Sequence, residues 1–411
     1  MGSATKAQEE SAAIKKELDQ LTAAAEKYLK LSSSGDASET DVAPYKYELM
    51  MKTMRLLQTI RGPVDMVFAN FEDMSRIGAI RTLLAAGVFD AIPVGGASMT
   101  AEEIAAKTGM DKQILVRLMR SVTPLGPFVE TGEEQYAHTS FSEIYLSPQM
   151  AAVFTLMVDE FLLPMIKNHE FLRQHNWKDH IGIRHNPFTY SHDCEGITMF
   201  EKVSESPERL ARFNEAMVAQ DSSQVTIGIY PFAEELGKYA TDDTVTIVDV
   251  GGGRGHILRQ IKESSPGLKG RFILQDRDEV IEDNKKSLIS HGIEAMAHDF
   301  FKPQPVKGAL AYYFRRIFHD WPDEPESKKI LQNIAAVMDR ERSRVLITEF
   351  IVPETGNSML PAWMDHTMMT FGGMERTEKD FARLLDISGL KLVKVWRAPG
   401  TPVGVVEARL K

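Results

Sequence analysis

One histidine and two glutamates, placed at the ends of expected strands or in a turn, have side chains that suit proton transfer. His319 stands in IFHDWPD, just past a strand expected at 309–314, while Glu349 ends the next strand and Glu375 lies in the turn GGMERT. A lone histidine before Asp-Trp-Pro is as compatible with a structural role as with catalysis. If a carboxylate accepts the proton of one ring nitrogen, however, the other nitrogen is left as a free acceptor. The pattern therefore predicts His319 as a general base, oriented by Glu349 and Glu375.

A glycine-rich turn follows the strand expected at 244–250, in the stretch TVTIVDVGGGRGHIL. Gly251 and Gly253 let the backbone turn tightly and let a ligand lie directly against it. The dinucleotide fingerprint would need a glycine where this chain has His256, and the Gly-Lys-Ser/Thr ending of the phosphate loop is missing. A flat or extended ligand of another class is therefore expected at this turn.

Two aspartates near the turn favour a positively charged nucleoside. Asp249 would repel a pyrophosphate but would suit an ammonium or sulfonium group. Asp276 follows the next expected strand, 271–275, where an acid can hold the two hydroxyls of a ribose. S-adenosyl-L-methionine combines these groups, so we predict it as the cofactor. Its methyl group would move in line to an oxygen nucleophile, leaving S-adenosyl-L-homocysteine as the product.

Composition narrows the function classes. The 411 residues carry a formal net charge of −10, which argues against a general nucleic-acid binder because such proteins need a basic face. Cys194 is the one cysteine of the sequence, so no internal disulfide or cysteine-based zinc cluster can form. The N-terminus lacks the apolar core of a signal peptide, and no run of 18 apolar residues occurs. We therefore expect a cytoplasmic protein without a nucleic-acid or membrane partner.

From residue 241 to residue 411, expected strands alternate with helical segments. The strands are expected at 244–250, 271–275, 293–297, 309–314, 344–350, 390–396 and 403–409. This alternation predicts an α/β, Rossmann-like domain with a seven-stranded, mostly parallel sheet and an antiparallel edge formed by the last two strands. Ligands of such sheets bind beyond the carboxyl ends of the strands. One crevice is therefore expected to be faced by Asp249, Asp276, Asp299, Arg315 and Glu349.

Two segments precede residue 150. Residues 1–42 are expected to form a helical arm that ends in the polar linker SSSGDASETD, and residues 43–150 two capped helices and a hairpin. The cap signals are Thr100 with Glu103 before one helix and Asp111 before the next. This winged-helix arrangement predicts dimerisation rather than DNA binding, because its second helix is not strongly basic.

Residues 151–240 are rich in Phe and Met at helical spacing, which usually marks core positions. As a group, lying just before the α/β domain, these residues suit the wall of a site for an aromatic substrate, so the segment is predicted as a helical linker that lids the site. The candidate substrate-binding residues are Phe161, Met165, Phe200 and Met217, with Met364 and Met368 later in the chain.

Six segments in order resemble the motifs of the plant-type, class I S-adenosylmethionine-dependent O-methyltransferases. They are TIVDVGGGRGHI, RFILQD, HDFF, RRIFHDWPD, VLITEFIVPE and FGGMERTEKDF. The fungal members that act on secondary metabolites, of the sterigmatocystin type, are the most similar in appearance. The similarity runs from about residue 60 to the end, and it implies a homodimer formed through the winged-helix domain, a small aromatic substrate and no metal.

The same resemblance implies roles for single residues of the cofactor site. Gly251, Gly253 and Asp276 match positions that hold the methionine moiety and the ribose, and Asp299 and Phe300 match the adenine site.

Further positions concern the reacting end of the cofactor. Arg315 matches a basic residue near its methionyl end, and His319 matches the catalytic base, flanked by Glu349 and Glu375.

Two alternatives remain open at this point. Some fungal relatives keep the fold and the cofactor but catalyse dehydrations or pericyclic reactions, and these look altered at the base, whereas His319 and both acids are intact here. A regulator that binds DNA or a partner through the winged helix and senses the cofactor is the other alternative.

Overall fold

The computed structural model describes residues 5–33, 39–222 and 228–411, and the chain divides by its contacts into two compact units, Met1–Val158 and Asp159–Lys411. The finer boundaries expected after residues 42, 150 and 240 remain predictions.

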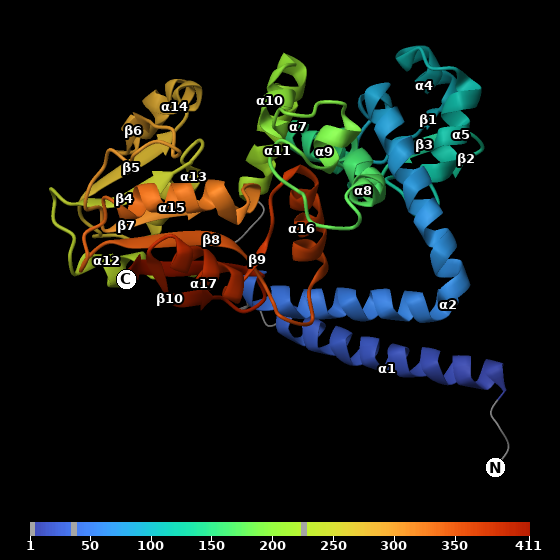
Figure 1. Ribbon diagram of the computed structural model, residues 1–411. Helices are drawn as coiled ribbons and strands as arrows, with labels where there is room; N and C mark the ends of the chain where they lie inside the picture. Colours follow the sequence, from blue (N-terminus) through green and yellow to red (C-terminus); the bar gives the residue numbers. More distant parts are fainter. Residues whose placement is uncertain (1–4, 34–38, 223–227) are drawn as a thin grey trace. The chain divides into compact units, whose positions relative to one another are not determined.

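The first unit begins with two long helices that pack along each other (Figure 1). Helix α1 (Lys6–Ser32) starts at a capping box between Thr5 and Gln8. Helix α2 (Glu39–Ala85) changes direction at Gly62, where φ is +68°. The polar linker expected over residues 32–41 is therefore shorter than predicted, because α2 already begins at Glu39, where acidic side chains favour the positive end of a helix dipole. Residues 34–38 of that linker lie outside the described residues.

A small antiparallel sheet and two capped helices follow, and they confirm the winged-helix prediction. Its elements are α3 (Val88–Ala91), β1 (Met99–Thr100), α4 (Ala101–Thr108), α5 (Lys112–Val122), β2 (Phe128–Gly132) and β3 (Gln135–His138), with strand order β1-β3-β2. Thr100 and Glu103 form the expected capping box, and Asp111 accepts the backbone N–H of Ile114. Short elements α6 (Ser140–Glu143) and η1 (Ile144–Leu146) lead to α7 (Pro148–Leu156).

Among the described residues, one helix is long and apolar enough to cross a membrane: it runs from α7 through the π-helix η2 (Met157–Leu162) to α8 (Leu163–Gln174). A single such helix is weak evidence. Glu160 within it is buried and accepts a hydrogen bond from Arg209 at 2.9 Å, and Asp159 pairs with Arg212 at 3.0 Å. A buried carboxylate with a guanidinium partner, such as Glu160, indicates packing against protein.

Four further helices of the second unit precede its sheet: α9 (Pro187–Ser191), α10 (Met199–Ser204), α11 (Pro207–Ser222) and α12 (Phe232–Gly237).

The sheet of the second unit has the order β10-β11-β8-β7-β4-β5-β6. Its strands are β4 (Val245–Val250), β5 (Arg271–Asp276), β6 (Glu294–Ala297), β7 (Ala311–Arg315), β8 (Arg344–Val352), β10 (Leu390–Arg397) and β11 (Val403–Leu410). These are the seven predicted strands, and β10 and β11 form the predicted antiparallel edge. A short eighth strand, β9 (Arg376–Thr377), pairs with β8 and was not predicted, because two residues are too few to show a period.

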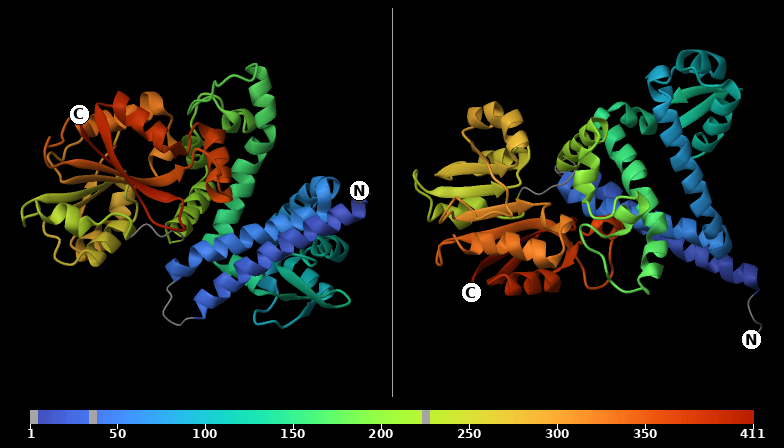
Figure 2. Two further views of the ribbon diagram at one scale, coloured as in Figure 1. Left: turned by 90° about the horizontal axis from the view of Figure 1, so that it is seen from below. Right: turned by 45° about the horizontal axis from the view of Figure 1, so that its top comes forward.

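Helices lie on both faces of this sheet (Figure 2). They are α13 (His256–Ser264), α14 (Asp278–Ser290), α15 (Lys328–Ala335) and α17 (Glu378–Ile387). Helix α16 (Met359–Phe371) instead contacts α8, α9 and the 3₁₀ helix η3 (Phe318–Asp320), and the π-helix η4 (Asp323–Ser327) precedes α15. The helical segment between β7 and β8 begins as η4 and continues directly as α15.

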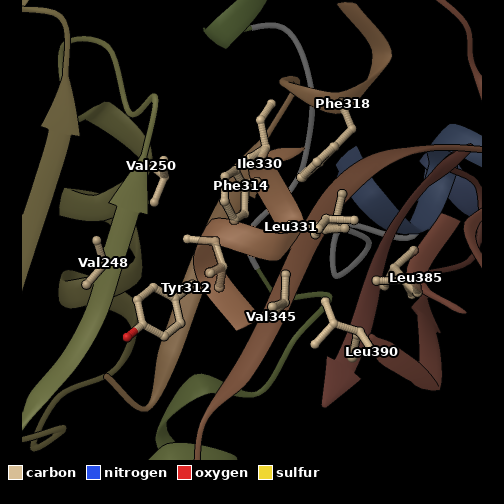
Figure 3. Close-up of a cluster of buried hydrophobic side chains, with 14 of the residues drawn as sticks. Val248, Val250, Tyr312, Phe314, Phe318, Ile330, Leu331, Val345, Leu385 and Leu390 are labelled. Atoms are coloured by element: carbon tan, nitrogen blue, oxygen red, sulfur yellow. The ribbon is translucent and has the colours of Figure 1, made fainter. Parts of the chain in front are cut away.

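Alternate residues of the central strands pack against α15 and α17 to form the core of one face (Figure 3). Tyr312 and Phe314 of β7 meet Ile330 and Leu331 of α15 in this cluster. Because helices cover both faces of the sheet, the positions of the strand ends are well defined. The residues of the candidate site lie at or just after the carboxyl ends of β4, β5, β7 and β8.

Candidate active site

The glycine turn after β4 packs against the segment that carries His319. The N–H groups of Gly251 and Gly252 both donate to the carbonyl of Gln275, at 2.8 and 3.2 Å. Gly251 has φ of +74°, and a Cβ placed there would come within 2.6 Å of the Ile317 Cδ1 atom. A side chain would be strained at this φ, and its Cβ would displace the end of the Ile317 side chain, so a glycine favours the close approach of the two turns.

Asp276 ends β5 with both carboxylate oxygens already oriented. Its Oδ2 accepts the Gly253 N–H and its Oδ1 accepts the Arg277 N–H, each at 2.8 Å. Burial raises the pKa of this carboxyl, and the two N–H groups oppose that shift. Each oxygen keeps a further lone pair, which is what a pair of ribose hydroxyls needs.

A cavity of about 1080 Å³ opens beside this turn. Of the predicted cofactor residues, Gly251, Asp276, Asp299 and Phe300 line it. Its acidic lining residues outnumber its arginines and lysines: they are Glu201, Asp276, Asp278, Glu279, Asp299, Asp320 and Glu326, against Arg184, Arg277 and Lys329. A cavity with this excess of acids favours a cationic ligand.

Aromatic side chains form another part of the cavity wall. Phe200, a predicted substrate residue, stacks on Trp321 with ring centroids 5.8 Å apart and an angle of 27° between the planes. Phe301 meets the same Trp321 edge to face at 4.9 Å. Met217 also lines the cavity. Trp321 and Phe301 were missed from the sequence, although Trp321 stands two residues after His319 and Phe301 follows Phe300.

Other predicted residues lie away from the cavity lining. Asp249 is buried beneath the turn, where a Cβ on Gly252 would come within 2.6 Å of its Oδ2 atom. The structure therefore differs from the expectation that Asp249 and Glu349 face the crevice, because both are buried and neither lines the cavity. Arg315 at the end of β7 is half-buried and is also absent from the lining, as is Gly253.

Four of the six predicted substrate residues are packed elsewhere in the second unit. Phe161 is buried with its ring 5.7 Å from that of Phe371. Met364 and Met368 on α16 are buried and Met165 is half-buried, and none of them lines the cavity. For these residues the structure supports the core role that helical spacing usually indicates.

His319 lies in η3, just past β7, and its ring is almost wholly buried, with 6% of the residue exposed. Its Nδ1 atom is 3.1 Å from Oε1 of Glu375, and its carbonyl accepts the Met374 N–H at 2.8 Å. Burial lowers the pKa of His319, and the nearby Arg316 guanidinium lowers it further. The ring is therefore neutral at neutral pH, as a general base requires.

The two predicted orienting acids act differently. Glu375 contacts the ring directly, and burial raises its pKa to about 7. Glu349 instead accepts the backbone N–H groups of Ile317 and Phe318, both at 3.0 Å, so it shapes the turn on which the histidine sits. Its predicted contact with the ring is replaced by these two bonds, because the chain turns back over the end of β8.

Two neighbours of His319 were missed by the sequence reading. Asp320 lines the cavity, its Oδ1 is 3.5 Å from His319 Nε2, and burial raises its pKa to about 6. Arg316 has φ of +56°, lies over the Phe350 ring at 4.6 Å and is 3.6 Å from Glu375. His319 itself is absent from the cavity lining, whereas Ile317, Asp320 and Trp321 belong to it. The ring therefore lies immediately behind that wall.

His319, Glu349 and Glu375 each offer an atom within 4.8 Å of the others, a spacing that could also hold a metal ion. Glu349 already accepts two backbone N–H groups, and Arg316 stands next to Glu375. A cation beside a guanidinium is disfavoured, which favours proton transfer as the use of this trio.

Two family models match the chain. An O-methyltransferase domain covers residues 175–391, and an O-methyltransferase dimerisation domain covers residues 74–148.

Individual relatives extend this similarity to nearly the whole length. O-methyltransferase kntB of Aspergillus niger is 39% identical over 89% of this chain and 88% of its own. The crystal structure of OxaC in complex with SAH and oxaline is 50% identical, with a TM-score of 0.89 over 98% of this chain and 100% of that one. A structure described as a pericyclic reaction enzyme is 25% identical, with a TM-score of 0.82 over 96% of this chain and 100% of its own.

Proposed function

The chain belongs to the O-methyltransferase family, and from this premise we propose that it methylates a phenolic or enolic hydroxyl of a small aromatic, polyketide-type secondary metabolite. The observation that carries the proposal is the buried, neutral His319, with Nδ1 held by Glu375, directly behind the wall of an acidic cavity.

The residues present fit S-adenosyl-L-methionine. The bare backbone of Gly251, the Asp276 carboxylate and the Phe300 ring line one cavity, and they suit the methionyl chain, the ribose and the adenine respectively. Asp299 lies beside Phe300 in the same lining. When bound, the cofactor supplies a methyl group on a sulfonium, the charge that the acidic lining favours.

His319 would take the proton of the substrate hydroxyl. A phenol with a pKa near 10 is a poor nucleophile until its proton leaves, and general-base help is worth roughly 10² to 10⁴ in rate. Glu375 accepts the Nδ1 proton and so leaves Nε2 as the acceptor. Trp321 and Phe200 offer flat faces on which an aromatic substrate can stack.

Incubation of the enzyme with S-adenosyl-L-methionine and a panel of phenols and enols tests the proposal by mass spectrometry. A product heavier by one CH₂, formed together with S-adenosyl-L-homocysteine, is expected. His319→Gln should lower turnover by at least about 10² while leaving cofactor affinity nearly unchanged. Undiminished turnover in this variant would show that the substrate ionises without the imidazole.

The likeness to a pericyclic reaction enzyme motivates a second candidate, a reaction in which the cofactor is bound but not consumed. Substrate conversion without any S-adenosyl-L-homocysteine would identify it. The intact His319–Glu375 pair favours methylation. The regulator alternative loses its basis, since the model that matches residues 74–148 describes a dimerisation domain.

We propose a homodimer as the working form. The dimerisation match and exposed apolar side chains of α2, among them Leu57 before the break at Gly62 and Phe68 and Phe71 after it, support it. Methyl transfer by this scheme needs no metal. A cytoplasmic location and the lack of nucleic-acid and membrane partners remain proposals that rest on composition.

A further inference from the structure

Two histidine rings of the second unit, far in sequence from the catalytic residues, meet nitrogen to nitrogen. The Nε2 atoms of His175 and His185 are 2.9 Å apart. His175 caps the C-terminus of α8, and His185 forms an isolated β-bridge with Gly182 just before α9. Both rings therefore stand on anchored backbone.

The partners of the other ring nitrogens fix both tautomers. His175 Nδ1 is 2.8 Å from the carbonyl oxygen of Phe171, and His185 Nδ1 is 2.8 Å from Oε2 of Glu195. A carbonyl or a carboxylate can only accept, so each Nδ1 must carry the ring proton. Glu195 is itself held in place, since its Oε1 accepts a hydrogen bond from Thr189 at 3.0 Å.

Two neutral rings would therefore direct unprotonated Nε2 lone pairs at each other. That arrangement is repulsive unless a cation, either a proton or a metal ion, lies between or beside them. Histidine ligands of metals typically donate their other N–H to a carbonyl or a carboxylate, as both rings do here.

We propose that His175 and His185 bind a divalent transition-metal ion of the zinc type. Two imidazole nitrogens bound at 2.0–2.1 Å to one ion are about 2.8 to 3.0 Å apart at a square bond angle and about 3.3 to 3.4 Å apart at a tetrahedral one. The observed 2.9 Å matches the square angle, so a tetrahedral ion would move the two rings apart by about 0.4 Å. Imidazole suits Zn²⁺, Cu²⁺ and Ni²⁺ and disfavours Mg²⁺ and Ca²⁺.

Two further side chains, Phe171 and His180, lie next to the histidine pair. The Phe171 ring packs against His175 and His185, with centroids 4.5 and 5.1 Å away, and shields one side of the pair from water. The ring of His180, in the loop between them, is 5.2 Å from that of His175. A rotation of this exposed side chain would supply a third imidazole.

The position of the site gives the ion a structural role. Residues 182–185 form the turn that His185 closes, and Ile183 and Arg184 of this turn line the cavity. Arg184 donates two hydrogen bonds to Glu201, also in the lining. A metal at the histidine pair would therefore hold one wall of the cavity in place without taking part in methyl transfer.

Calorimetric titration of zinc chloride into untagged, chelator-treated protein tests the proposal. One zinc ion per chain is expected, and it should raise the melting temperature. His175→Gln and His185→Gln should each weaken this binding more than about 100-fold, and Glu195→Gln about 10- to 100-fold, the range typical for partners of metal ligands.

Two matched variants locate the site. His169→Gln changes an exposed histidine of the same helix, whose Nδ1 faces the carbonyl of Ile166, and it should bind zinc like the wild type. His319→Gln should also bind normally, which separates the pair from the buried trio. Failure of the wild-type protein to bind zinc would mean that a shared proton satisfies the two rings, and it would overturn the proposal. Wild-type affinity in both His175→Gln and His185→Gln would overturn it equally.

Discussion

Glu375 controls which nitrogen of His319 can act. With its pKa raised to about 7, its carboxyl is protonated below that pH and ionised above it. The protonated acid would donate to Nδ1, so the ring proton would sit on Nε2 and block it. The ionised acid accepts from Nδ1 and frees Nε2.

The turnover number should therefore rise with pH through about 7. The Glu375→Gln variant should lose this limb of the pH profile and turn over roughly 10- to 100-fold more slowly, since its amide oxygen accepts from Nδ1 at every pH without a charge. A pH series of kcat on both proteins measures this. Persistence of the same limb in the variant would assign it to another group.

Asp276 is the residue on which cofactor affinity should depend most. Asp276→Ala removes a charged acceptor of hydrogen bonds and should cost roughly 1.5 to 3 kcal/mol, or about 10- to 100-fold in affinity. Calorimetry with S-adenosyl-L-homocysteine measures it, and Asp283→Ala, on exposed helix surface, is the control. Equal affinity of the two variants would contradict the ribose assignment.

At the scale of elements, the turn after β4 and the turn that carries His319 meet at one close approach, between Gly251 and Ile317. Gly251→Ala would both strain a backbone at φ of +74° and push its Cβ against Ile317, next to the histidine turn. We expect it to lower cofactor affinity and turnover together. Gly308→Ala, at φ of +66° with open space around the new Cβ, carries only the strain of about 1 to 2 kcal/mol.

Comparing Gly251→Ala with Gly308→Ala separates the effect of contact with Ile317 from the backbone strain that both variants share. Thermal melting reports the shared strain, and calorimetry with S-adenosyl-L-homocysteine reports the local effect. If Gly251→Ala bound the cofactor as well as Gly308→Ala does, the turn would be more tolerant than its spacing to Ile317 indicates.

At the scale of the whole molecule, assembly should depend on the apolar face of α2. Phe68 and Phe71 are 57% and 56% exposed, and packing against a second copy of the chain would remove this apolar surface from water. Phe68→Lys combined with Phe71→Lys should convert dimer to monomer in light scattering after size exclusion. Ile289→Lys, at 61% exposure on α14, should leave the dimer unchanged. A wild-type monomer, or a dimer that survives the double change, would refute this interface.

The sequence by itself determined the features that local chemistry dictates. Alternating strand and helix periods predicted the parallel sheet, Thr100 and Asp111 begin their helices as predicted, and Gly251 of the glycine turn lines one cavity together with Asp276. Each of these depends on near neighbours in the chain, so pattern alone suffices.

Only the tertiary structure decided how distant residues meet. Glu349 accepts hydrogen bonds from the backbone of the turn that carries His319, whereas Glu375 contacts the ring of His319. Asp249 is buried, and Asp320 and Trp321 line the cavity. The tertiary structure also brought the Nε2 atoms of His175 and His185 to within 2.9 Å of each other, although neither residue has a distinctive sequence motif. Such contacts depend on how packed elements fix side chains separated by many residues, and no local period encodes that geometry.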